Sequence, residues 1–350
     1  MSGGVDSSVA AALLSEAGHE VVGVTLHLYD SGPGRRVGRC CAAVDQDDAR
    51  RAAAHLGIRH YTLDWRERFD RLVIRDFVQT YAAGETPTPC TRCNVDVKFG
   101  PLVDVCRGLG TEWLATGHYA RVEVDENGTR KLLRGRDDLK DQSYFLFALP
   151  QEVLKRTVFP LGWLTKTQVR EQARRLGLPN AEKPESMEVC FVEGASVGDF
   201  VARRLPAPPA PGIVVDGQGQ RIGGHPGIHH YTVGQRRGLP VLGDGKPRYV
   251  VALDGASGTV IAGRPEELDR LELDTRDVSW VGGTPPASAR PLAVQVRHRH
   301  VPAEALVVPD GSDRARVRFT SPIRAVANGQ AAVFYSGDEV VGGGWIAASR

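Results

Sequence analysis

Along residues 1–120, short apolar runs typical of buried strands alternate with stretches whose apolar residues have helical spacing. Residues 21–26 form a continuous β-branched apolar run, which is typical of a buried parallel strand. Helical spacing follows at 47–56, and a second strand pattern covers 59–63. The same alternation continues with predicted helices at 69–83 and 99–109 and a strand at 113–116. This alternation predicts a doubly wound, parallel α/β sheet, which binds ligands at the carboxyl ends of its strands.

The second half of the chain follows a different pattern. Residues 145–205 are predicted to be mostly helical, with one helix starting at Thr165 and stopping at Gly177. A proline-rich stretch, 205–212, reads as a linker, and short β runs between glycine-rich turns follow it to the end. We therefore predict an α/β domain with a helical part (1–204), a small β-rich central domain (205–272) and a C-terminal β-barrel (273–350).

Composition narrows the class of protein only slightly. The chain has 350 residues, 41% of them hydrophobic and 25% charged, which predicts packed globular domains. A net charge of +2 neither demands nor excludes nucleic acid. We expect a cytoplasmic protein with no membrane contact, because we find neither a signal peptide nor an apolar run long enough to span a bilayer.

The sequence SGGVDSS, residues 2–8, has the features of an anion site. Two glycines allow close backbone approach, and the start of the helix predicted after them favours phosphate. A flexible N-terminus ahead of a capped helix is the plainer alternative. A phosphate loop of this kind should follow a buried strand, yet Met1 stands where that strand should end. Either the true start lies upstream or the sheet lacks its central strand.

Cysteines form the second group of candidates. The spacing of Cys90 and Cys93 suits half a zinc site or a redox pair, and the adjacent Cys40 and Cys41 could complete a four-sulfur site only with poor geometry. In this reducing compartment six cysteines in a long chain do not make a disulfide scaffold. Read locally, Cys106 and Cys190 are core residues.

Other polar stretches are ambiguous when taken singly. His118, in ATGHY, is predicted to be a hydrogen-bonded loop histidine, and Lys140–Tyr144 reads as solvated surface. Residues 297–300 form a cationic run. Arg314, Arg316 and Arg318 alternate with apolar residues, so a strand would place all three on one face that suits phosphates or is simply solvated.

Together these stretches resemble a known family. SGGVDSS, TPTPCTRCN with KFG, ATGHY, KDQSYFL, EVCF, YTVGQRRGL, NGQAAVFY and GGGWI occur in the order found in the tRNA-specific 2-thiouridylases, which are PP-loop ATP pyrophosphatases. SGGVDS alone marks only the superfamily, whereas the ordered set with two separated cysteines is specific. The resemblance implies an enzyme that replaces the C2 oxygen of the wobble uridine of tRNA with sulfur.

The resemblance also implies roles for individual residues. Cys93 would be the nucleophile and Cys190 the persulfide carrier, loaded by a sulfur-carrier protein, and a transient Cys93–Cys190 disulfide would form between them. ATP, with Mg²⁺, would bind to Met1, Ser2, Gly3, Gly4, Val5, Asp6, Ser7, Ser8, Leu26 and Gly117. The target base would contact Thr88, Pro89 and Cys90, although some relatives carry aspartate in place of Cys90. The anticodon stem-loop of tRNA would contact His118, Lys140, Asp141, Gln142, Arg297, His298 and Gln330.

Two other functions remain open from the sequence. A PP-loop ligase forming an amide or C–N bond would use residues 2–8 but would not need Cys93 and Cys190. A non-catalytic tRNA-binding protein would need neither ATP nor the thiols.

Overall fold

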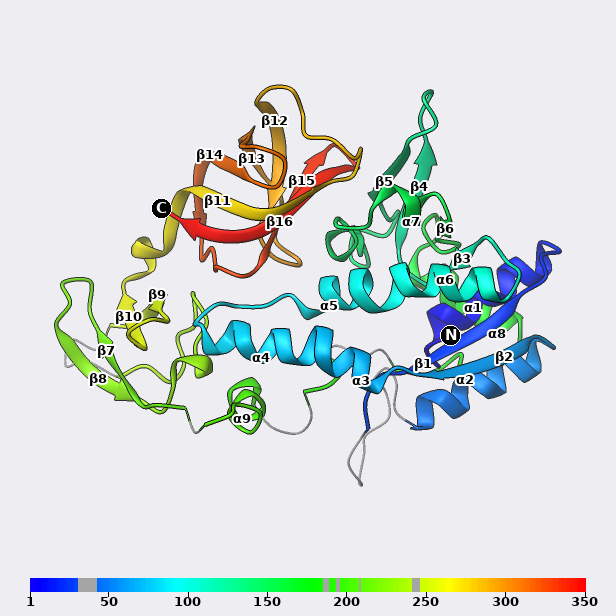
Figure 1. Ribbon diagram of the computed structural model, residues 1–350, viewed down its shortest axis with the longest axis horizontal. Coiled ribbons are helices and arrows are strands. Elements are labelled where there is room, and N and C mark those ends of the chain that lie inside the picture. Colours follow the sequence, from blue (N-terminus) through cyan, green and yellow to red (C-terminus); the bar gives the residue numbers. More distant parts are fainter. Residues whose placement is uncertain (31–42, 185–188, 193–195, 208, 241–245) are drawn as a thin grey trace.

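The computed structural model describes residues 1–30, 43–184, 189–192, 196–207, 209–240 and 246–350 (Figure 1). Cys40 and Cys41, which the sequence suggested as further zinc ligands, lie outside the described residues. Among the described residues, no helix combines the length and apolar character needed to cross a membrane.

Two parallel strand pairs form the α/β part. β1 (Val22–His27) pairs with β2 (Arg59–Asp64), and the short β3 (Leu114–Ala115) pairs with β6 (Thr157–Val158). This confirms the parallel α/β class, although the described strands form two separate pairs. α1 (Val5–Glu16) and α2 (Ala43–His55) belong to this part. The Met1 amino group donates to the Val24 carbonyl, so the first residue lies beside β1.

Two long helical stretches cross the molecule next to these pairs (Figure 1). The first runs through α3 (Arg66–Phe69), a π-helical segment (Asp70–Ile74) and α4 (Arg75–Ala82). The second runs through α5 (Pro89–Arg92), a π-helical segment (Cys93–Phe99) and α6 (Gly100–Gly108). Single π-helical turns inside helices are frequent at functional sites, and here one begins at Cys93.

The prediction of a mostly helical 145–205 is wrong in extent. The described residues there form only three short helices, α7 (Gln151–Leu154), α8 (Lys166–Arg175) and α9 (Val197–Ala202), besides the strand β6 and a short 3₁₀ turn (Ser143–Phe145). Prolines at 150, 160, 179 and 184 cannot continue a helix, which explains the interruptions. α8 begins as predicted, because Thr165 and Gln168 form a capping box.

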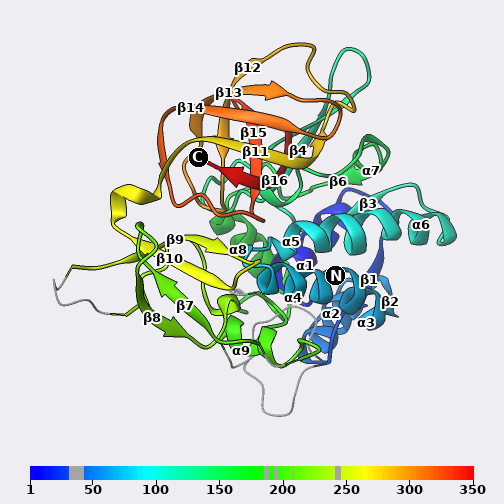
Figure 2. The same cartoon turned by 60° about the vertical axis from the view of Figure 1, so that its left-hand side comes forward.

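The central part is a four-stranded sheet in the order β8-β7-β10-β9. Its strands are β7 (Gly212–Val215), β8 (Arg221–His225), β9 (Tyr249–Asp254) and β10 (Thr259–Gly263). Ile228, Tyr231 and Val250 are in its small core. In Figure 2 this sheet lies next to the C-terminal barrel, with β9 and β10 nearest to it.

Six strands close the C-terminal barrel as predicted, in the order β11-β14-β13-β12-β15-β16, with β16 pairing back to β11. They are β11 (Asp269–Trp280), β12 (Arg290–Gln295), β13 (Ala303–Pro309), β14 (Ala315–Arg324), β15 (Ala331–Ser336) and β16 (Glu339–Ser349). β14 alternates buried and exposed residues over Ala315–Thr320, as a strand with one face on a core must.

A hairpin from the first half of the chain extends this sheet. β4 (Ala120–Val124) pairs with β5 (Arg130–Arg134), and Leu132 and Leu133 of β5 pair with Val340 and Glu339 of β16. One core cluster therefore joins Phe99 and Phe147 to Val333 and Trp345. This shared core fixes the α/β part against the barrel.

Candidate nucleotide and thiol site

The predicted phosphate loop is a tight turn at the start of α1. Ser7 Oγ accepts from the Ser2 N–H at 3.0 Å, and the Ser7 and Ser8 hydroxyls both donate to the Gly4 carbonyl. Gly3 has φ +71°, and a Cβ there would lie 2.0 Å from the Asp45 carbonyl oxygen. Only glycine fits this position, so the loop keeps its backbone N–H groups at a helix start, where anions bind.

Asn180 and Lys183, which the sequence did not single out, hydrogen-bond to the phosphate loop. Asn180 Nδ2 donates to the carbonyls of Gly3 and Gly4 and to Ser8 Oγ, at 3.0–3.2 Å. Lys183 Nζ donates to the Gly3 carbonyl at 3.2 Å. These contacts join residues more than 170 positions apart, so no local pattern could have indicated them.

Lys183 belongs to a buried ion triad. Its ammonium pairs with Asp45 and with Asp48, and the three side chains are 8%, 4% and 14% exposed. Burial disfavours the charged ammonium, but hydrogen bonds to both aspartates outweigh burial and raise the Lys183 pKa. We expect a permanently charged lysine that keeps α2 and the phosphate loop together.

Asp6 and Gly117, both predicted to bind the nucleotide, lie next to each other, and their contact with ATP stays a prediction. Asp6 Oδ1 accepts from the Tyr119 hydroxyl at 2.8 Å and from Lys166 Nζ at 2.7 Å. A Cβ on Gly117 would lie 2.7 Å from the backbone of Asp6 and Ser7, so the strand end packs directly on the loop. Lys166, at the start of α8, is a further contact that the sequence analysis missed.

The neighbouring His118 is neutral. Its Nδ1 is 2.8 Å from the Thr116 hydroxyl, and its ring packs near Phe99 and Phe159. Burial, helped by the Lys98 charge, lowers the His118 pKa to about 3. The local prediction of a hydrogen-bonded loop histidine is confirmed, and its contact with tRNA stays a prediction.

The structure gathers both predicted thiols in one apolar cluster, which we call the aromatic cluster. Cys93 is buried within it, and the half-buried Cys190 packs against it. The Tyr29 hydroxyl donates to the Cys190 carbonyl at 2.5 Å. Other members are Leu26, Leu28, Phe69, Val73, Ile74, Phe77, Val78, Val97, Phe191, Val192, Phe200 and Val201.

Phe191 anchors the end of the EVCF motif in this cluster. Its ring lies 5.6 Å from that of Phe69 and 5.1 Å from that of Phe77. No disulfide links Cys93 to Cys190 in the structure, so the predicted transient bond is not formed in this state. Leu26, predicted to pack on adenine, belongs to the same cluster.

The predicted base-contact residues lie where the α/β part meets the barrel. Thr88 and Pro89 are buried, whereas Cys90 is exposed on the first turn of α5. The Thr86 N–H donates to the Asn328 carbonyl at 2.8 Å. The Arg92 guanidinium lies 4.9 Å from the centre of the Trp345 ring. A small cavity of about 50 Å³ opens here between Thr88, Arg92 and Trp345.

Three groups singled out in the sequence come together in the structure: the TPTPCTRCN stretch, the KDQSYFL segment and the Arg297–His298 pair. Asn94 Nδ2, one residue after Cys93, donates to the Phe145 carbonyl at 3.0 Å. The Phe145 ring lies 4.6 Å from that of His298. The KDQSYFL segment therefore contacts the residue that follows Cys93, and the Arg297–His298 pair, more than 150 residues away in the sequence, packs on the same segment.

Several predicted tRNA contacts also have partners within the chain. Asp141 is buried and accepts from Arg134, from the N–H of Gly135 and from Ser143. Gln142 Oε1 accepts from the Tyr119 N–H. Direct contact of these side chains with tRNA stays a prediction, as it does for Lys140, Arg297, His298 and Gln330.

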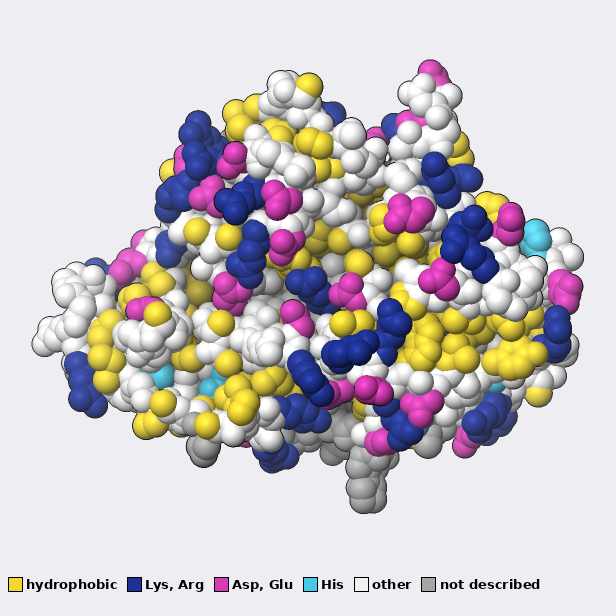
Figure 3. All heavy atoms as spheres, in the orientation of Figure 1, with side chains coloured by type: hydrophobic (Ala, Val, Ile, Leu, Met, Phe, Trp, Pro, Cys, Tyr) yellow, Lys and Arg dark blue, Asp and Glu magenta, His cyan; other side chains and the backbone are white. Residues whose placement is uncertain are grey.

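The alternating arginines on β14 do not form an uncompensated cationic face. Arg316 pairs with Asp274 at 3.0 Å and Arg318 with Glu272 at 3.1 Å, because the β11–β14 register sets these residues opposite one another. Figure 3 shows Lys and Arg interleaved with Asp and Glu over the barrel. Of the two interpretations, the structure favours a solvated sheet face.

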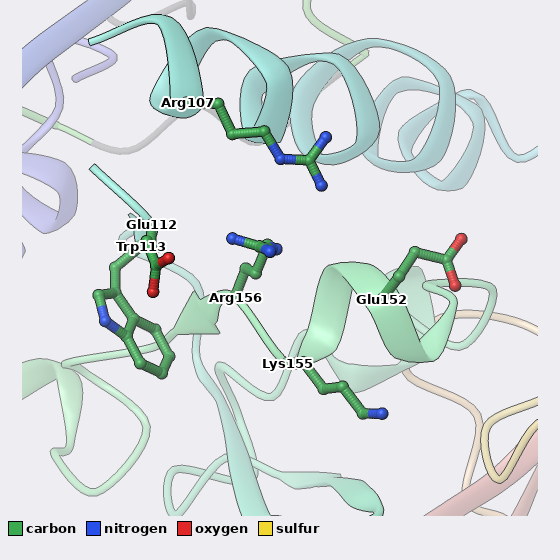
Figure 4. A pocket seen from close by; sticks show the side chains of 6 residues that line it. All are labelled: Arg107, Glu112, Trp113, Glu152, Lys155 and Arg156. Atoms are coloured by element: carbon green, nitrogen blue, oxygen red, sulfur yellow. The ribbon is translucent and has the colours of Figure 1, made fainter. Parts of the chain in front are cut away.

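No predicted site residue lines the larger of the two cavities described here, and no triad of metal ligands exists among the described residues. The cavity, about 320 Å³, lies between α6 and α7 and is lined by Arg107, Glu112, Trp113, Glu152, Lys155 and Arg156 (Figure 4). The described His, Cys, Asp and Glu side chains form no group of three that could hold a metal ion.

A glycine turn at a helix start beside parallel strands, together with two thiols gathered in one cluster, is typical of a nucleotide-binding α/β domain of the PP-loop class, here joined to two β modules. Family models agree: residues 1–194 match the "tRNA methyl transferase HUP domain", 198–264 the "tRNA methyl transferase PRC-barrel domain" and 270–346 the "Aminomethyltransferase beta-barrel domain". The domain boundaries predicted from the sequence stay predictions.

Full-length relatives identify the family more closely. The chain is 49% identical to "tRNA-specific 2-thiouridylase MnmA" of Sorangium cellulosum, over 100% of this chain and 91% of that protein. It is 48% identical to the protein of the same name from Geobacter metallireducens, over 100% and 96%. A solved NMN synthetase from Francisella tularensis is only distantly similar (17% identity, TM-score 0.33, covering 57% of this chain and 68% of that one). The chain belongs to the tRNA-specific 2-thiouridylase family.

Proposed function

We infer that this protein is an ATP-dependent tRNA 2-thiouridylase, which replaces the C2 oxygen of the wobble uridine with sulfur. The observation that carries this inference is the gathering of Cys93 and Cys190 in one cluster with Leu26 and Tyr29, near the end of β1. An amide-forming ligase of the same class has no use for two thiols brought together in this way. Both substrates, ATP and tRNA, are present in the cytoplasm, where we propose that the enzyme acts.

The phosphate loop fits ATP. A uracil carbonyl oxygen is a poor leaving group, and transfer of AMP from ATP to that oxygen, with release of pyrophosphate, converts it into a good one. The N–H groups at the start of α1 would bind the phosphates, and Gly3 and Gly117 keep the loop in place. Asn180 Oδ1 is buried without a hydrogen-bond partner among the described residues, and as an acceptor it suits a cation, a water or a hydroxyl group rather than a phosphate oxygen.

A divalent cation would neutralise part of the phosphate charge. Mg²⁺ binds through one or two carboxylates together with substrate phosphates, so it needs no all-protein ligand set. Asp6, a carboxylate within the loop itself, could serve, and Lys166 and Tyr119 orient it.

The two thiols would deliver sulfur. A sulfur-carrier protein, which holds sulfur as a persulfide, would transfer it to Cys190. The Cys93 thiolate would attack Cys190 Sγ, which forms the Cys93–Cys190 disulfide and releases hydrosulfide. Hydrosulfide would then attack C2 of the activated uridine and displace AMP. A thiol reductant would restore both cysteines before the next cycle.

The target base must leave the anticodon stack to reach this site, which costs least for an unpaired loop nucleotide. Thr88, Pro89 and Cys90 begin α5, which leads directly to Cys93. His298 and Phe145 offer a pair of rings beside the same helix, and rings of this kind stack on unpaired bases.

One assay tests the inference. Unmodified tRNA, ATP and a persulfide donor are supplied, and thiouridine is measured by mass spectrometry. Cys93→Ser and Cys190→Ser should each abolish the product. Cys106→Ser is the matched control, because Cys106 lies on α6 and packs in the core shared with the barrel, outside the aromatic cluster.

The other functions give different outcomes in this assay. If either serine variant still thiolates tRNA, the roles assigned to Cys93 and Cys190 are wrong. A ligase would form AMP without adding sulfur to tRNA. A binding protein would retard tRNA on a gel and leave ATP intact.

A further inference from the structure

A second motif, YTVGQRRGL, has no role in the chemistry above. In the structure it forms a turn over residues 231–238, which we call the arginine turn. Arg236 and Arg237 at its tip are exposed, and in the described part of the chain neither of them has an ion-pair partner. Many other exposed arginines, such as Arg66 and Arg175, are paired with carboxylates.

The rest of the arginine turn is built to hold these two residues in place. Gln235 Nε2 donates to the carbonyls of His230 and Arg237, at 3.2 and 2.9 Å. The hydroxyl of the buried Tyr231 donates to the Gly238 carbonyl at 2.9 Å. Gly234 and Gly238 have φ of +90° and +81°, which other residues rarely adopt. A turn fixed in this way loses little conformational entropy when it binds a ligand.

The arginine turn docks on the barrel next to a predicted RNA contact. A Cβ on Gly234 would lie 2.8 Å from the Ala325 Cβ, so the turn touches Ala325. The Ala325 carbonyl accepts from Arg297 Nη1 at 3.2 Å. The turn that carries Arg236 and Arg237 therefore meets the barrel at Ala325, which Arg297 also contacts.

We propose that the arginine turn binds the sugar–phosphate backbone of the tRNA substrate through Arg236 and Arg237. Guanidinium groups suit phosphate oxygens, and such contacts position an RNA without reading its sequence. The proposal rests on the proposed function, since it extends the surface that would hold the tRNA. It adds the central sheet to that surface.

Salt dependence of tRNA binding tests the proposal. Each phosphate contact releases counterions, so its loss reduces the slope of log K against log salt by about 0.7–0.9. Arg236→Gln/Arg237→Gln in the full chain should lower the slope by about 1.4–1.8 and weaken binding roughly 20-fold near 0.15 M salt. Arg236→Lys/Arg237→Lys should keep most of the slope.

The matched control is Arg316→Gln/Arg318→Gln, which removes the same charge from arginines that are already paired. It should leave both affinity and slope unchanged. An unchanged slope in the Arg236/Arg237 glutamine variant overturns the proposal, whether or not its affinity falls. A wild-type chain that binds tRNA with the expected slope but makes no thiouridine would contradict the proposed function alone.

Discussion

Ion pairs of similar length occur around the phosphate loop and along the barrel, and they differ in exposure. Lys183, Asp45 and Asp48 are almost entirely buried. Arg318 and Glu272, on β14 and β11, are 55% and 31% exposed. Water and salt screen the second kind of pair but not the first. The buried charges near the loop therefore help to fix its structure, whereas the exposed pairs between β11 and β14 contribute little to stability.

The buried triad gives the sharpest test of this difference. Lys183→Met would leave Asp45 and Asp48 buried without their cation. Removing one partner of a buried pair costs about 3–5 kcal/mol. We expect a lower urea midpoint for the transition of the α/β part, monitored by circular dichroism, together with a raised KM for ATP because Gly3 loses a hydrogen bond.

Arg175→Met is the control for that experiment, because Arg175 forms an exposed pair with Glu16. It should leave the midpoint and the KM unchanged. If both variants unfold at the same urea concentration, burial is not what distinguishes the two kinds of ion pair.

His118 extends the comparison to pH. Its folded-state pKa, about 3, lies below the unfolded value of about 6.5, so the unfolded chain binds a proton first as pH falls. Stability should therefore drop between about pH 6.5 and 3, by an amount on the order of 2–4 kcal/mol. His298, on the barrel side, has a pKa that burial and then Arg299 also lower.

His118→Gln keeps a hydrogen-bonding side chain and removes the titration. Unfolding midpoints measured from pH 7 to pH 4 should depend less on pH in this variant than in the wild type. His298→Gln should change the dependence less. Equal pH profiles for wild type and His118→Gln would mean that folding does not lower the pKa of His118.

Local patterns predicted much of the fold. The strands at β1 and β2, the capped start of α8 and the closed C-terminal barrel follow from β-branched runs, a Thr–Gln capping pair and regular alternation. The glycine turn at the start of a helix was also predicted, whereas its packing against Gly117 was not.

What the sequence did not reveal depends on tertiary pairing. Asn180 and Lys183 look like ordinary loop residues until the chain returns to the phosphate loop. The alternation of Arg316 and Arg318 was visible, but the register that sets them opposite Asp274 and Glu272 was not. The β4–β5 hairpin likewise joins the barrel through a pairing more than 200 residues away.

The smallest expected effect is on the barrel itself. Arg318→Gln removes an exposed ion pair with Glu272, and Arg350 also pairs with that carboxylate, at 3.3 Å. Since a second arginine remains and solvent screens the site, the free energy of unfolding should change by less than about 1 kcal/mol. Raising the salt concentration should reduce even this difference, measured as the shift in urea midpoint at low and high salt. A loss as large as that of Lys183→Met would show that the β11–β14 pairs act as a buried network and would remove the distinction between the two regions.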